Sequence, residues 1–67
     1  MNTIDPIETA LAAVTDTERA LDAAFSNAQP GDEITELVRA CTAAKATALA
    51  AGASGTQVML AASEALI

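Results

Sequence analysis

The chain has 67 residues, a single cysteine, no histidine and a formal net charge of −6. A chain of this length forms at most one small domain and buries only about 60% of the surface that its unfolded form exposes. One cysteine excludes a disulfide within the chain, and a single thiol without histidine argues against a metal site, so we predict no cofactor. Small domains without such supports usually rely on association. We therefore expect self-association as a homo-oligomer or a protein partner.

The charge is uneven along the chain. Residues 1–33 contain seven acids and one base, which gives −6, whereas two acids and two bases cancel in residues 34–67. This balance argues against direct contact with nucleic acid, because the phosphates would be repelled. It is compatible with a basic protein partner, and nothing in the sequence indicates a small-molecule substrate.

Alanine dominates the apolar composition. The chain has eighteen alanines, one phenylalanine and neither tryptophan nor tyrosine. Alanine favours helix because it loses no side-chain entropy on ordering, but it contributes little buried area. We predict an all-α fold with a thin core: an antiparallel helical hairpin followed by a short third helix, all in one domain over residues 1–67.

The first helix is predicted over about residues 6–28. Asp5 is a good N-cap, Pro6 suits the first helical position, and Glu8 can reach back to the cap. Apolar residues then recur at steps of three and four, which predicts a core-facing stripe. The stripe comprises Ile4, Ile7, Leu11, Val14, Leu21, Phe25 and Ala28. A competing helix start lies at residues 15–18, but the stripe continues in phase across it.

A turn is predicted over residues 27–32. Pro30 should stop the first helix, Gly31 should allow the reversal, and Asp32 should cap a second helix over about residues 33–51. Ile34, Leu37 and Cys41 form its predicted core stripe. We interpret Cys41 as a buried thiol, since no histidine is available to activate it.

Alanines four residues apart occur in both long helices. They are Ala20, Ala24 and Ala28 in the first helix and Ala40, Ala44 and Ala48 in the second. Their spacing lets two backbones approach closely. We predict a tight hairpin, with a partner-facing alanine ridge as the alternative.

The third helix is predicted over about residues 55–66. Gly52 suits the end of the second helix, and Ser54 with Gln57 forms a capping box. The helix is apolar nearly all round, which is typical of a buried helix and hard to satisfy at the end of so short a chain. It is therefore the first candidate partner-binding surface, comprising Val58, Met59, Leu60, Ala62, Leu66 and Ile67.

An acidic face on the first helix is the second candidate surface. It comprises Glu8, Asp16, Glu18 and Asp22. These acids could attract a basic partner or simply keep the chain soluble. Glu18 also interrupts the core stripe. It is predicted to lie at the edge of the core, to specify register, or to contact a partner's lysine or arginine.

The sequence predicts a protein without enzymatic activity. General acid–base catalysis needs a carboxylate in a dry pocket, which helices this small seldom enclose. The main hypothesis is a helical protein–protein interaction module: an adaptor, a co-chaperone or an oligomerising subunit. The alternatives are a structural subunit of a filament, and a phage-type acidic inhibitor that occupies the basic groove of a nucleic-acid-binding protein.

The expected location is the cytoplasm. Asp5 and Glu8 lie where a signal peptide would carry positive charge, although export without a signal peptide stays open. The longest uncharged run, residues 46–63, is interrupted by glycine and polar residues, which argues against a membrane span.

Overall fold

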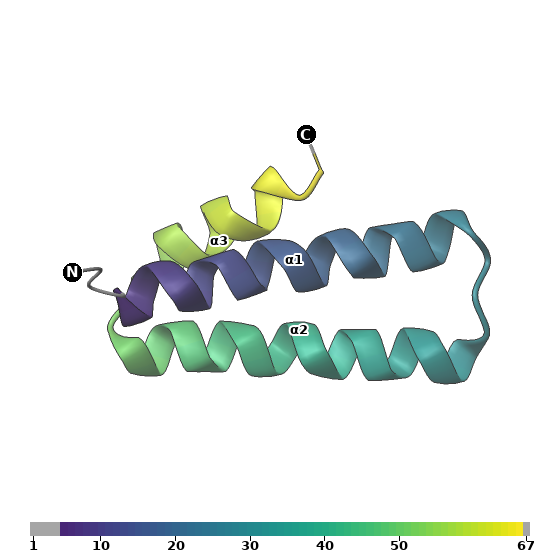
Figure 1. Cartoon of the computed structure of the whole chain (residues 1–67), viewed down its shortest axis with the longest axis horizontal. Helices are drawn as coiled ribbons and strands as arrows, with labels where there is room; N and C mark the ends of the chain where they lie inside the picture. Colours follow the sequence, from purple (N-terminus) through teal and green to yellow (C-terminus); the bar gives the residue numbers. More distant parts are fainter. Residues whose placement is uncertain (1–4, 67) are drawn as a thin grey trace.

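The computed structural model describes residues 5–66 and confirms the predicted fold class. Two long helices, α1 (Pro6–Ser26) and α2 (Gly31–Ala51), pack antiparallel as a hairpin, and a short helix, α3 (Gly55–Glu64), follows. The described residues contain no strand. Figure 1 shows α3 lying beside the N-terminal part of α1, with the turn between α1 and α2 at the opposite end of the hairpin. Ile4 of the predicted core stripe and Ile67 of the predicted partner surface lie outside the described residues.

The start of α1 follows the sequence prediction. The Asp5 carboxylate accepts a hydrogen bond of 2.9 Å from the backbone N–H of Ile7, and Pro6 occupies the first helical position. The helix continues without a break through residues 15–18, so the competing start is not used. The Thr17 hydroxyl instead donates to carbonyl oxygens one turn earlier in its own helix, at 2.9 and 3.1 Å.

The chain reverses at Ala28 rather than at Gly31, which corrects the predicted turn. Ala28 has a φ of 52°, in the left-handed region that favours glycine, whereas Gly31 is the first residue of α2. The backbone N–H of Gln29 donates to Ala24 O at 3.0 Å, and that of Ala28 donates to Phe25 O at 3.2 Å. These two bonds define a Schellman motif, which satisfies the last carbonyls of α1.

The predicted cap at Asp32 is also wrong. Pro30 is the N-cap of α2 and no side chain caps this helix. The Pro30 carbonyl accepts from the backbone N–H groups of Glu33 and Ile34, at 3.0 and 3.2 Å. The φ of −56° that the proline ring imposes, with an extended ψ of 148°, starts the helix at Gly31, one residue before Asp32. Asp32 therefore lies within the first turn, where its charge complements the helix dipole.

The link between α2 and α3 agrees with the sequence prediction. Gly52 ends α2 with a φ of 111°, and Ala53 N donates to Ala48 O at 3.0 Å in a second Schellman motif. At the start of α3 the Ser54 hydroxyl accepts from Gln57 N at 3.1 Å, and Gln57 Oε1 accepts from Ser54 N at 2.8 Å. Both bonds of the predicted capping box are thus present.

The hydrophobic core lies where all three helices meet. Val14 is its largest fully buried side chain, and small residues make up most of the rest. The buried cluster consists of Ala10, Val14, Ala48, Ala53, Val58 and Ala61, with Ile7, Leu11, Ala44 and Ala62 packed against it. We call this three-helix part the closed half, and the part of the hairpin nearer the turn between α1 and α2 the open half.

The alanine ridges serve the hairpin in part, as predicted. Ala24 and Ala48 are buried and Ala44 is half-buried against the core. Ala20 and Ala40 are exposed. Ala28 is exposed as well, so the close approach of α1 and α2 uses Ala24 of the first ridge and Ala44 and Ala48 of the second.

Among the described residues, the predicted core stripe is wrong at Phe25 and at Ala28, which are both exposed. Val14 and Cys41 are buried. The half-buried members are Ile7, Leu11, Leu21, Ile34 and Leu37. Phe25 is 60% exposed, because α3 has ten residues against the 21 of α1 and does not extend over the open half.

Candidate protein-interaction surface

The third helix, α3, packs against only part of the hairpin. At 1.5 Å per residue, α1 is about 31 Å long and α3 about 15 Å long. Among the described residues, no element covers the side of the open half that α3 covers on the closed half (Figure 1). α1 is therefore about 16 Å, or three helical turns, longer than α3, and beyond α3 the described chain adds only Ala65 and Leu66.

Large apolar side chains are exposed on the part of the hairpin that α3 does not cover. A shallow hollow of about 150 Å³ lies between the C-terminal half of α1 and the end of the described chain. It is lined by Glu18, Leu21, Asp22, Phe25 and Leu66. Phe25 is 60% and Leu66 69% exposed. Exposure of this kind in neighbouring large side chains is typical of an interaction site.

Val38 is an exposed large apolar residue on the open half of α2, although it does not line the hollow. It precedes Lys45 by seven residues, or two helical turns, so the two side chains leave α2 on the same face. Lys45 reaches across to Glu18, which places that face beside the hollow. Val38 is 45% exposed. We define the open face as Leu21, Asp22, Phe25, Val38 and Leu66.

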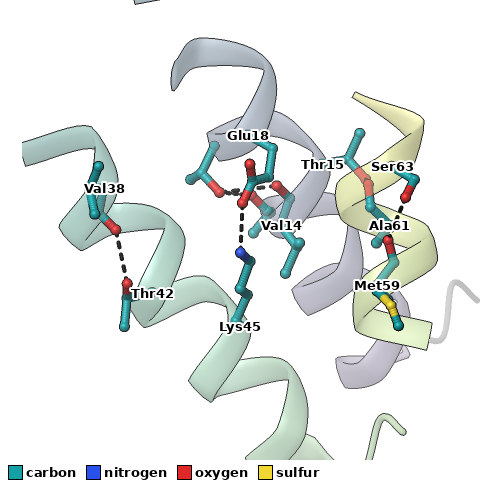
Figure 2. A network of polar contacts seen from close by, with 11 residues as sticks. Val14, Thr15, Glu18, Val38, Thr42, Lys45, Met59, Ala61 and Ser63 are labelled. Atoms are coloured by element: carbon teal, nitrogen blue, oxygen red, sulfur yellow. Dashed lines mark hydrogen bonds and ion pairs between the residues drawn. The ribbon is translucent and has the colours of Figure 1, made fainter. Parts of the chain in front are cut away.

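An ion pair separates the open face from the core. Lys45 Nζ lies 2.8 Å from Glu18 Oε1, with 41% of the Lys45 side chain and 20% of the Glu18 side chain exposed. Figure 2 shows this pair bridging α2 and α1. Among the alternatives for Glu18, the structure places it at the core edge, paired with a cation of its own chain.

The remaining cations are also engaged within the chain. Arg39 Nη1 lies 2.7 Å from Glu36 Oε1, and Arg19 Nη1 lies 3.8 Å from Asp16 Oδ1, both on the surface. The chain has three basic residues, so each one has an acidic partner. Within residues 5–66, six acids have no ion-pair partner: Asp5, Glu8, Asp22, Asp32, Glu33 and Glu64.

The four acids of the predicted acidic face do not form one cluster. Glu18 and Asp22 lie together at the hollow. Glu8 instead lines a separate groove of about 360 Å³ between α1 and α3, and Asp16 is occupied by Arg19. Glu18 and Asp22 therefore lie beside the exposed Phe25 and Leu66, whereas Glu8 lies in the other groove with the exposed Leu60.

The apolar surface predicted on α3 is divided by the packing. The prediction that Val58 belongs to the partner-binding surface is wrong, because Val58 is only 8% exposed and belongs to the core of the closed half. Ala62 is half-buried against that core. Met59 and Leu60 are 66% and 61% exposed. Val58 is buried since it lies one turn after the Ser54 cap, on the side of α3 that contacts the hairpin.

Thr15 anchors α3 and was missed by the sequence reasoning. Its hydroxyl donates to Ala61 O at 2.8 Å, and Ala61 is only 6% exposed. Figure 2 shows Thr15 beside Ala61. The Ala61 carbonyl is among the last four of α3, which have no partner of their own within a helix. No local signal could have identified this bond, because 46 residues separate the two groups.

Comparison with known proteins gives no family for this chain. No family model matches it, and searches of curated proteins and of solved structures returned no match. Over residues 5–66, no group of three or more His, Cys, Asp or Glu residues is placed to hold a metal ion. No helix in that range combines the length and apolar character needed to cross a bilayer.

Proposed function

We propose that this chain is a non-catalytic protein–protein interaction module, and that a partner helix completes its third-helix layer over the open half. The observation that carries the proposal is the surface beside α1 that α3 leaves uncovered on the open half. On the closed half, α3 packs against the corresponding surface of the hairpin, and Val58 and Ala61 are buried there. On the open half, Phe25 and Leu66 remain exposed around a hollow.

The energetics support an added helix. Burying a large apolar side chain contributes about 1.5–3 kcal/mol. Phe25, Val38 and Leu66 together therefore offer several kcal/mol to a partner, before the cost of association is subtracted. The isolated chain obtains only part of this energy, because 60% of Phe25 and 69% of Leu66 remain exposed.

The proposed binding mode is a helix in a groove. In such complexes the partner contributes apolar side chains at steps of three and four residues. The spacing of α3 itself illustrates the fit, since Val58, Ala61 and Ala62 pack against the hairpin at these steps. The cytoplasm is the proposed location of this module.

A titration followed by NMR tests the proposed function. The probe is a synthetic helical peptide of about fourteen residues, or four turns, with a leucine stripe and glutamine on its other faces. Backbone amide shifts should change around residues 18–25 and 34–38 and stay constant on the outer face of α3. Replacing Phe25 with serine should abolish the changes.

Light scattering over a dilution series supplies the second arm. A dimer or larger assembly that Phe25→Ser dissociates would also support the open face as a binding surface. The proposal fails if the chain is monomeric at every concentration and the peptide produces either no shift changes or changes scattered over all three helices.

A further inference from the structure

The negative charge near the open face has no counterpart within the chain. All three basic residues are already engaged by Glu18, Glu36 and Asp16. Asp22 lies in the hollow beside Leu21 and Phe25 and has no cation partner among the described residues. A cation supplied by a partner would therefore meet an unpaired carboxylate at Asp22.

A second copy of this chain is poorly suited to supply that cation. Each copy carries a net charge of −6, and its lysine and arginines are already held in ion pairs. Two open faces brought together would place two Asp22 carboxylates at one interface. Like charges juxtaposed across an interface disfavour association.

We propose that the occupant of the open face is a basic amphipathic helix of a different protein, with an apolar stripe about three turns long. Its stripe contacts Leu21, Phe25 and Leu66, and a lysine or arginine beside the stripe pairs with Asp22. This inference rests on the proposed function and names the chemistry of the partner.

The geometry of the open face explains both the apolar stripe and the basic residue of the proposed partner. α1 exceeds α3 in length by about 16 Å, which corresponds to three turns of helix. Asp22 and Glu18, which pairs with Lys45, line the hollow together with the apolar side chains of Leu21, Phe25 and Leu66. Long basic side chains can cover such a floor with their methylene groups while their charged ends reach a carboxylate at the rim.

Competing peptides test the inference by fluorescence anisotropy. One peptide has the leucine stripe with glutamine flanks described above, and the other has the same stripe with lysine flanks. The lysine peptide should bind at least about tenfold more tightly, a difference of about 1.4 kcal/mol. Its advantage should shrink as sodium chloride is raised, because salt screens exposed charges.

Matched variants locate the interaction. Asp22→Asn should reduce the advantage of the lysine peptide, whereas Glu8→Gln, which removes the same charge from the far end of α1, should leave most of it. Phe25→Ser should weaken both peptides. Met59→Ser should weaken neither, although Met59 is as exposed as Phe25.

The outcomes separate the inference from the proposed function. If both peptides bind the open face equally well, or if Asp22→Asn and Glu8→Gln act alike, the surface binds helices but the basic partner is wrong. A dimer that Phe25→Ser dissociates would likewise assign the face to a second copy. If neither peptide depends on Phe25 and no dimer forms, both the inference and the proposed function are wrong.

Discussion

The turn between α1 and α2 holds Ala28 in a conformation that glycine adopts more easily. Its φ is 52°, and its N–H donates to Phe25 O in the Schellman motif. A left-handed residue with a Cβ costs about 1–2 kcal/mol. Glycine removes this cost, but it adds about 0.4–1 kcal/mol of entropy to the unfolded chain. Ala28→Gly is therefore expected to raise the free energy of unfolding by about 0.5–1 kcal/mol.

Thermal and urea unfolding followed by circular dichroism measure this effect. For a domain of this size, the expected gain corresponds to a rise in Tm of about 2–8 °C. Gly52→Ala is the matched reverse change, because Gly52 occupies the same place in the Schellman motif of α2 with a φ of 111°. A methyl group added at Gly52 would lie 3.5 Å from the Ile7 Cδ1 atom, an ordinary contact distance. The expected loss of about 1 kcal/mol or more therefore comes from the backbone.

A lowered or unchanged Tm for Ala28→Gly would refute the reasoning. It would show that the turn does not hold Ala28 in the left-handed region in solution. A loss of stability in Gly52→Ala together with no gain in Ala28→Gly would confine that failure to the first turn.

Three further predictions concern packing and polar contacts. Thr15→Val should lower the free energy of unfolding by about 1–2 kcal/mol in urea titrations, because it leaves Ala61 O without its donor. The control is Thr17→Val, which loses only bonds within α1 and should stay within about 0.5 kcal/mol of the parent. Val14→Ala should cost about 2 kcal/mol, since it removes two buried carbon atoms and leaves a cavity; an unchanged midpoint would contradict the placement of the core. A double-mutant cycle on Glu18 and Lys45 should give a coupling of about 0.5–1 kcal/mol that decreases with salt, and a coupling of zero at low salt would show that the pair does not form.

The sequence predicts the helices well because their ends depend on local chemistry. The signals at Asp5 and Pro6 and at Ser54 and Gln57 act within a few residues of chain. Asp5, Ser54 and Gln57 make the cap bonds expected of them, and Pro6 takes the first helical position. The turn between α1 and α2 was harder to predict. Pro30 starts α2 without any side-chain cap, and Ala28 adopts a conformation that its side chain disfavours.

The candidate surface could be predicted only in part. A repeat of apolar residues identifies which face of a helix is buried, but not how far a neighbouring helix reaches along it. Phe25 and Val14 belong to the same stripe, and only the length of α3 makes one exposed and the other buried. Val58 shows the converse, since an apolar helix does not reveal which of its sides meets the hairpin.

The position of the main buried cluster at one end of the hairpin has a consequence for local unfolding. Backbone amides are protected from hydrogen exchange by the packing around them, and poorly packed segments open without global unfolding. The amides around Val14 and Ala48, both fully buried, should therefore exchange most slowly, and protection should decrease toward Ala28. A bound helix on the open face would flatten this gradient, so that the arrival of a partner at Phe25 is recorded in the exchange rates of the adjoining turn.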